Sequence, residues 1–160
     1  MKFLSLVQLF LLCTTSLSAQ SGEHHTSPRE NEKGTYEIIM SGIYVFEQGD
    51  DFAGTEFHFT YWINDRWGGG LSYTRKFEEG ESRNGVALLG SWNPSGWMTL
   101  NAGPNLTYSP KNQTNEWGLY AESELNIRLK RWFHFGPVLG TVIGKSYEVS
   151  TGFHLGFEFQ

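Results

Sequence analysis

A two-residue alternation of apolar and polar side chains runs from Thr35 almost to the end of the chain. It is clearest over residues 147–159, where one set of alternate positions is largely aromatic or aliphatic and the other includes Glu148, His154 and Glu158. Because successive side chains of a β-strand point to opposite faces, this period predicts strands with one apolar and one polar face. The sequence therefore predicts an all-β fold.

The predicted strands are long. Most contain about ten to thirteen residues, against about five or six in soluble sheets, and a tilted strand needs about 9–11 residues to cross a bilayer. We expect eight strands, over residues 35–46, 54–63, 67–78, 85–92, 97–108, 116–127, 132–143 and 147–159. The first is ambiguous, because both of its faces carry aliphatic side chains. Length and alternation together predict an up-and-down, eight-stranded antiparallel transmembrane β-barrel.

Composition supports a membrane setting and excludes some partners. Charged residues make up 18% of the chain, below the roughly 25% of soluble domains. After the N-terminal segment no apolar run is long enough for a transmembrane helix, so a membrane location requires a closed barrel. The formal net charge of −5 argues against a nucleic-acid partner, since phosphate binding needs a basic surface.

The N-terminus has the pattern of an export signal. Lys2 precedes an apolar run over residues 3–12, and Ala19 is a small residue at a suitable cleavage point. We therefore predict a signal peptide at residues 1–19, a flexible polar tail at residues 20–34 and a barrel domain at residues 35–160. Cys13 is the single cysteine of the chain, so the mature protein would contain none.

The predicted connections alternate in length along the chain. Short turns are expected at residues 64–66, 93–96 and 128–131. Longer polar stretches are expected at residues 47–54, 79–84 and 109–115, with a brief one at residues 144–146. In an up-and-down barrel this alternation predicts a short-turned periplasmic end, which also holds both termini, and a longer-looped end. Tryptophans flank the short turns, as expected at a membrane interface: Trp62, Trp67, Trp92, Trp97 and Trp132.

The C-terminal sequence GFHLGFEFQ supplies alternating Phe153, Leu155, Phe157 and Phe159, followed by Gln160. With this ending, residues 35–159 resemble the eight-stranded outer-membrane barrels of the OmpX and OmpA membrane-domain type. The resemblance implies a Gram-negative outer membrane as the location. It also implies contact with outer-membrane lipid, recognition of the terminal aromatic residues by the barrel-assembly machinery, and a monomer.

If the apolar faces meet lipid, polar side chains fill the lumen, and eight strands leave no open channel. The expected lumenal residues are Glu56, His58, Thr60, Ser72, Thr74, Lys76, Asn101, Asn105, Glu122, Glu124, His134, His154 and Glu158. We expect a buried hydrogen-bonded network rather than a cofactor site. The alternative is a zinc-like ion held by Glu124, His134 and His154, with His58 approaching from across the barrel.

No catalytic residue is predicted. Small barrels that modify lipid A carry a His-x-Ser motif, but here His134 and His154 are followed two residues on by Gly136 and Gly156. The sequence therefore favours a non-enzymatic outer-membrane barrel with a structural or surface-interaction role. One alternative is a soluble periplasmic barrel of lipocalin type with an apolar ligand inside, because alternation does not say which face is inward. The other is a lipid-modifying outer-membrane enzyme.

Overall fold

The computed structural model describes residues 34–78, 81–109 and 114–159. The predicted signal peptide, and the predicted tail except for Gly34, lie outside this part of the chain. Regular structure within it consists of nine β-strands. They are β1 (Thr35–Glu47), β2 (Asp50–Trp62), β3 (Trp67–Glu78), β4 (Glu81–Trp92), β5 (Met98–Ser109), β6 (Thr114–Leu125), β7 (Ile127–Lys130), β8 (Phe133–Ile143) and β9 (Tyr147–Phe159). None of the described residues forms a helix long and apolar enough to cross a membrane.

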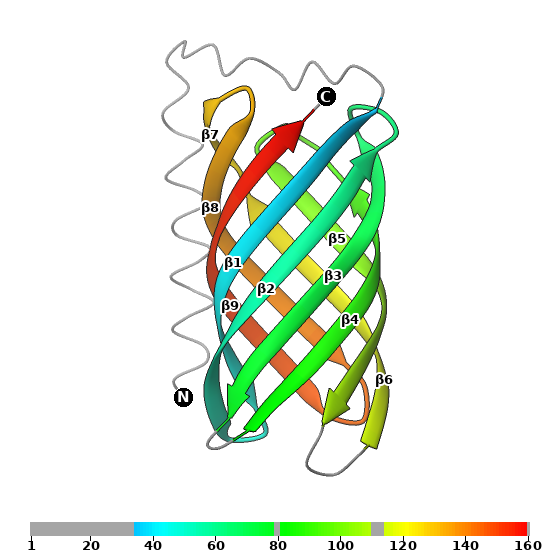
Figure 1. Cartoon of the computed structure of the whole chain (residues 1–160), viewed down its shortest axis with the longest axis vertical. Helices are drawn as coiled ribbons and strands as arrows, with labels where there is room; N and C mark the ends of the chain where they lie inside the picture. The colour runs from blue at the N-terminus through cyan, green and yellow to red at the C-terminus, as the bar shows by residue number, and fades with distance from the viewer. Residues whose placement is uncertain (1–33, 79–80, 110–113, 160) are drawn as a thin grey trace.

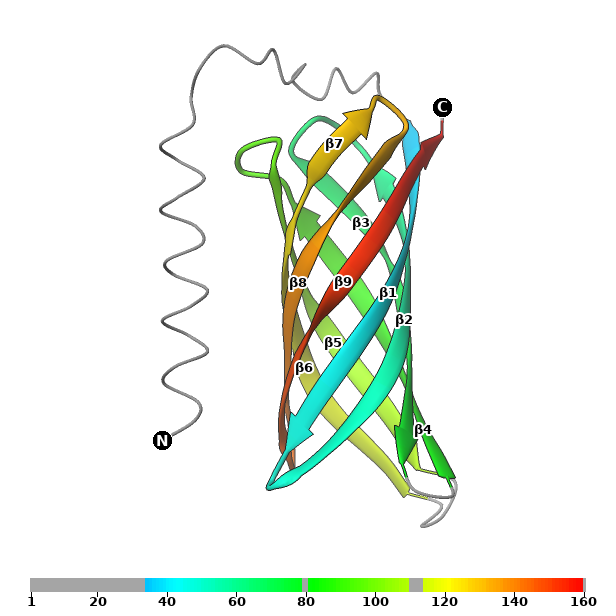
Figure 2. The same ribbon diagram turned by 90° about the vertical axis from the view of Figure 1, so that its left-hand side faces the viewer.

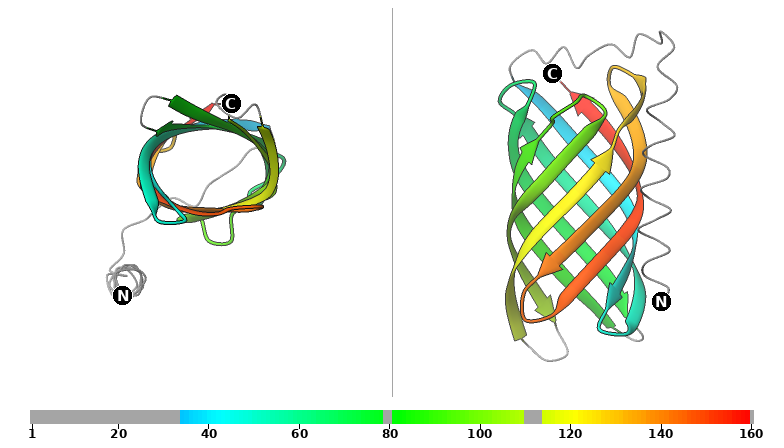
Figure 3. Two further views of the ribbon diagram at one scale, coloured as in Figure 1. Left: turned by 90° about the horizontal axis from the view of Figure 1, so that it is seen from below. Right: turned by 180° about the vertical axis from the view of Figure 1, so that it is seen from behind.

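The strands form one closed antiparallel barrel. Each strand from β1 to β6 pairs with its neighbour in sequence, β1 also pairs with β9, and β9 pairs with β8. Both β6 and β7 pair with β8 and are separated only by Asn126, so together they occupy one position in the wall. Because β6 and β7 share one position, the nine strands form the predicted eight-stranded barrel. Figures 1 and 2 show the tilted strands, and the end view in Figure 3 shows the closed ring.

The two faces of the ambiguous first strand are distinguished by burial. In β1 every second residue from Thr35 to Val45 is buried, and those between them are exposed. Ile39, Ile43 and Val45 therefore point inward, whereas Ile38 and Met40 point outward. Ile43 and Val45 form a small apolar cluster with Phe52 and Val138, which fills lumen space between polar groups.

The prediction of one longer-looped end is wrong. Strands β2, β4 and β6 begin at Asp50, Glu81 and Thr114, before the predicted starts, so that the predicted loops are mostly strand. Between β1 and β2 only Gln48 and Gly49 remain, with φ of 47° and 106°, values suited to a two-residue hairpin. The residues between the predicted strands are polar, and this polarity suggested loops. In the structure, polar residues at the ends of these long strands continue the backbone hydrogen bonding to the neighbouring strand. Both barrel termini do lie at the end with the turns after β2, β4 and β7 (Figure 1).

The outer wall is apolar over its whole height. Aliphatic side chains such as Leu71, Leu88 and Leu155 are exposed in the middle of the strands. The exposed tryptophans and all exposed tyrosines except Tyr73 lie toward the two ends: Tyr36, Tyr61, Trp67, Trp92, Trp97 and Trp132 toward one, and Tyr44, Tyr108, Trp117 and Tyr147 toward the other. Trp67 and Trp92 stack across β3 and β4, with ring centroids 5.9 Å apart. Trp62, predicted with this group, is instead buried in the lumen.

Strands β4 and β5 approach closely where their pairing is interrupted. The register passes from Ala87 opposite Asn105 to Gly90 opposite Ala102, and Pro104 within this gap has no amide hydrogen to donate. A Cβ atom on the neighbouring Gly103 would overlap the Leu88 carbonyl group and lie 2.9 Å from its carbon. Only glycine fits there without a shift of the backbone.

We expect Gly103→Ala to lower the free energy of unfolding by about 1–3 kcal/mol, the usual cost of overpacking. The matched control is Gly42→Ala, because a Cβ atom on Gly42 meets no heavy atom within 4 Å. This control should be as stable as the wild type or more stable. Urea unfolding in lipid vesicles measures both, and equal stability of the two variants would contradict the close approach.

Candidate functional site

The interior of the barrel is polar and charged. Each expected lumenal residue from Glu56 to His154 is buried, and Glu158 is partly buried. Glu37, Trp62, Tyr120 and Glu148 also face inward, although the set of expected lumenal residues did not include them. Their inward position follows from strand parity alone: Glu37 shares a face with Ile39, and Tyr120 with Glu122. The lumen contains three groups of ionisable side chains, which we name the terminal, central and distal clusters.

The terminal cluster lies near the chain termini and consists of Glu37, Trp62, Arg128, His134, His154 and Glu158. The Trp62 indole N–H donates to Glu37 Oε2 over 2.7 Å, and His134 Nε2 lies 2.7 Å from Glu37 Oε1. The Arg128 guanidinium donates to Glu158 over 2.6 Å. Both carboxylates therefore have charged or N–H partners, which offset the cost of their burial.

The predicted set of Glu124, His134, His154 and His58 is divided between two clusters. His134 Nδ1 and His154 Nε2 are 3.3 Å apart in the terminal cluster. Glu124 instead lies beside His58, with 3.2 Å between Glu124 Oε1 and His58 Nδ1. The strand register is the reason, since His134 lies opposite Gly156 and Glu124 lies opposite Val138. The prediction that Glu124, His134 and His154 share one height in the barrel is therefore wrong.

The central cluster consists of Glu56, His58, Asn101, Tyr120, Glu122 and Glu124, supplied by β2, β5 and β6. The His58 ring lies between carboxylates on both sides. Its Nε2 is 3.5 Å from Glu56 Oε1, and its Nδ1 is 3.5 Å from Glu122 Oε1. The Tyr120 hydroxyl lies 3.3 Å from His58 Nε2. A single imidazole thus faces three carboxylates, counting that of Glu124.

Neutral donors hold the carboxylates of the central cluster in place. Ser72 and Thr74 donate their hydroxyl hydrogens to Glu56 Oε1 over 3.0 and 2.7 Å. The Asn101 amide donates to Glu122 and Glu124 over 3.2 and 2.9 Å. Within the described part of the chain, no lysine or arginine lies within ion-pair distance of these three carboxylates.

The distal cluster lies at the other end of the lumen and consists of Glu47, Lys76, Glu78, Arg83 and Glu148. The Lys76 ammonium pairs with Glu148, and both side chains are almost fully buried. Arg83 pairs with Glu47 and Glu78, and its guanidinium lies 5.1 Å from the centre of the Phe52 ring. Opposite charges thus lie beside one another throughout this cluster.

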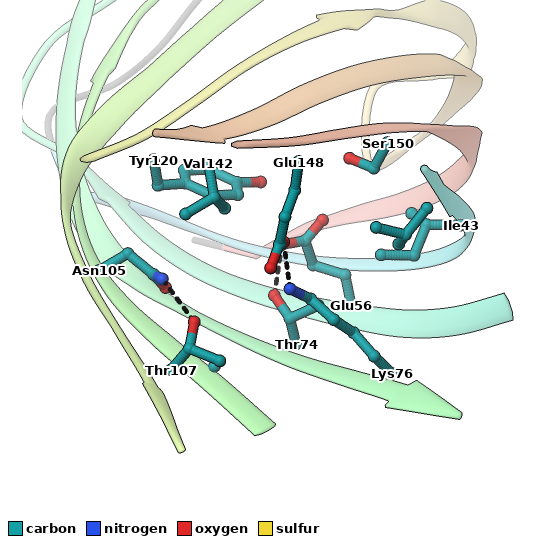
Figure 4. A pocket seen from close by; sticks show the side chains of 12 residues that line it. Ile43, Glu56, Thr74, Lys76, Asn105, Thr107, Tyr120, Val142, Glu148 and Ser150 are labelled. Carbon is teal, nitrogen blue, oxygen red and sulfur yellow. Dashed lines mark hydrogen bonds and ion pairs between the residues drawn. The ribbon is translucent and has the colours of Figure 1, made fainter. Parts of the chain in front are cut away.

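A small cavity separates the central and distal clusters (Figure 4). Glu56 and Tyr120 of the central cluster and Lys76 and Glu148 of the distal cluster all line it. Its volume of about 20 Å³ is enough for one water molecule. A cavity of this size has no room for an apolar ligand of the lipocalin type.

Comparison with known proteins identifies the fold. No protein-family model and no curated protein matches the sequence. Among solved structures, the Pseudomonas aeruginosa outer-membrane protein OprG matches with a TM-score of 0.59 and 13% identity, over 82% of this chain and 99% of that one. The N-terminal barrel domain of Pseudomonas aeruginosa OprF gives 0.59 and 16%, over 79% and 100%. Ail of Yersinia pestis, solved with the heparin analogue sucrose octasulfate, gives 0.55 and 14%, over 80% and 100%. The expected small outer-membrane barrel fold is thereby confirmed.

The buried ion pair between Lys76 and Glu148 allows a direct test of charge compensation in the lumen. We expect Lys76→Met to lower the free energy of unfolding by about 3–5 kcal/mol, because Glu148 would stay buried without its main counter-charge. The double variant Lys76→Met with Glu148→Gln should recover most of this loss, since no uncompensated charge remains. Unfolding titrations of the four members of the cycle measure the coupling. A single variant as stable as the wild type would show that the pair does not balance charge in the lumen.

Proposed function

We propose that this protein is an integral outer-membrane β-barrel of a Gram-negative bacterium with a non-enzymatic, structural role. One observation carries the proposal. The wall exposes aliphatic and aromatic side chains around its circumference. The acidic side chains and the imidazoles of the three clusters instead point into the lumen. In water this arrangement would expose a very large apolar surface, and in a bilayer the same surface contacts acyl chains.

The aromatic residues at both ends support a transmembrane orientation. Indole and phenol rings favour the boundary between hydrocarbon and head groups, because they combine an apolar ring with a polar atom. We infer that the end holding both barrel termini faces the periplasm, and that the signal peptide at residues 1–19 is removed after export. The outward side chains of β9, Phe153, Leu155 and Phe159, suit recognition by the barrel-assembly machinery. Closure of the wall within one chain supports a monomer.

The filled lumen supports a structural role over transport. Side chains of three charged clusters occupy the interior, and the cavity between the central and distal clusters is near the size of a single water molecule. A solute would have to displace buried, mutually compensating charges, which is costly. The hairpin between β1 and β2 has only Gln48 and Gly49 outside the strands, so that loop offers little surface to a partner.

The non-enzymatic part of the proposal has support from the surroundings of the histidines. A serine nucleophile requires a base within hydrogen-bond reach. In the described part of the chain, His58, His134 and His154 bond to tyrosine, carboxylate or imidazole groups and to no serine hydroxyl. We therefore place these histidines in a structural network and not in a lipid-modifying site.

Fractionation of cells that express the chain from its own signal tests the proposal. We expect the protein in the outer-membrane fraction, retained through high-salt, carbonate and osmotic-shock washes and released only by detergent, because acyl chains cover its wall. A soluble periplasmic maltose-binding protein is the control and should be released by osmotic shock. Release of the barrel along with that control would overturn the membrane assignment.

A further inference from the structure

The central cluster carries more negative charge than its protein partners neutralise. Glu56, Glu122 and Glu124 face one imidazole, that of His58. If all three carboxylates are ionised, even a charged His58 leaves two negative charges without a partner. Such charges are expensive to bury. The terminal and distal clusters differ, because Arg128 pairs with a carboxylate of the first, and Lys76 and Arg83 pair with those of the second. In each of these two clusters the carboxylates outnumber the lysine and arginine side chains by only one.

Several polar atoms of this cluster are buried and without a hydrogen bond. They are His58 Nδ1, Asn101 Oδ1, Glu122 Oε2 and Glu124 Oε2. All four side chains are at least nine-tenths buried. Buried polar atoms in a folded protein almost always have a partner, so four unsatisfied atoms in one place point to a group that the protein chain does not supply. Three of the four are oxygen acceptors, and acceptors attract a cation.

The spacing of the side chains fits a metal ion. Glu56, His58 and Glu122 each offer one ligand atom, and these three atoms lie within 4.8 Å of one another. On one side of the His58 ring, Nδ1 lies 3.5 Å from Glu122 Oε1 and 3.2 Å from Glu124 Oε1, whereas Glu56 Oε1 lies 3.5 Å from Nε2 on the other side. Ligands about 2.0–2.2 Å from a tetrahedral ion would be roughly 3.3–3.6 Å apart. The separations of Glu122 and Glu124 from Nδ1 fit this spacing directly, and Glu56 has to approach the ion from within the 4.8 Å that encloses the three ligand atoms.

We propose that the central cluster binds one first-row divalent cation of the zinc type inside the barrel. A ring nitrogen of His58 and carboxylate oxygens of Glu56 and Glu122 are its ligands, and Glu124 lies beside them as a fourth. The ion supplies the missing positive charge and satisfies the orphaned acceptors. It also joins β2 to β6 across the lumen, so that it stabilises the closed barrel.

The surrounding hydroxyl and amide groups suit a metal site. Ser72 and Thr74 donate to Glu56, and Asn101 donates to Glu122 and Glu124. Donors of this kind orient carboxylate ligands around a metal. The imidazole distinguishes the site from one for Ca²⁺, which prefers six to eight oxygen ligands. The cavity next to Glu56 has room for a water molecule near the ion.

The other group with metal-like spacing, Glu37, His134 and Glu158, is the weaker candidate. There Trp62 and His134 contact Glu37, and Arg128 contacts Glu158. Its carboxylates already have partners, and a cation would lie close to the guanidinium of Arg128. This group therefore provides a control of matched chemistry and burial.

The test is zinc retention by the full mature chain. Protein is refolded from denaturant into detergent micelles with Zn²⁺, freed of unbound metal by gel filtration, and analysed for zinc by atomic emission. We expect the wild type to retain about one zinc ion per folded chain at the cluster. His58→Gln and Glu122→Gln should bind zinc at least about tenfold more weakly, whereas His134→Gln should retain as much as the wild type.

Two controls make the comparison decisive. His24 and His25, outside the described residues, are present in every variant, so any zinc on them cancels in the comparison. Slower migration of boiled than of unboiled samples on a gel confirms that each variant has folded, and Glu122→Gln decides the matter if His58→Gln does not fold. Absence of zinc from folded wild type, equal retention by all variants, or loss in His134→Gln alone would overturn the proposal.

Discussion

Hydrogen bonding of the backbone is the constraint on which the rest of this structure depends. A strand in hydrocarbon has no water to satisfy its N–H and C=O groups, so the sheet must close on itself. Closure here is made by β6 and β7 together against β8, and by β1 against β9. With eight positions in the wall the lumen is narrow, and inward side chains must fill it. Glycines such as Gly103 allow the backbone of adjacent strands to approach where pairing is interrupted.

A narrow, closed lumen determines the chemistry inside. Alternation places about half of each strand's side chains there, and an apolar exterior leaves the polar ones for the interior. A charge buried in the lumen is costly because it is shielded from water. The clusters at both ends therefore pair carboxylates with Arg128, Lys76 or Arg83. Only the central cluster departs from this rule among the three, with carboxylates around His58 and orphaned oxygen atoms. That departure is what connects the electrostatics of the barrel to cation binding.

Much of the fold followed from the sequence because alternation and strand length are local properties. The faces of β9 and the lumenal positions from Glu56 to His154 were predicted correctly. The lengths of the connections were not, because Asp50 and Asp51 look like loop residues but continue the ladder of β2. The grouping of His58, Glu124, His134 and His154 held only in part, because His58 lies beside Glu124 in one cluster and His134 beside His154 in another. It depends on register between strands, and a shift of a few residues moves an imidazole from one cluster to the next.

The orientation of the wall can be measured directly, because the mature chain would contain no cysteine of its own. Single cysteines at Leu71 and Leu155, which are exposed in mid-strand, and at Asp65 in the turn after β2 would carry nitroxide spin labels in lipid vesicles. Collisions with oxygen should dominate at Leu71 and Leu155, and collisions with a water-soluble nickel chelate should dominate at Asp65. Access of the chelate to Leu71 equal to that at Asp65 would contradict a wall surrounded by acyl chains.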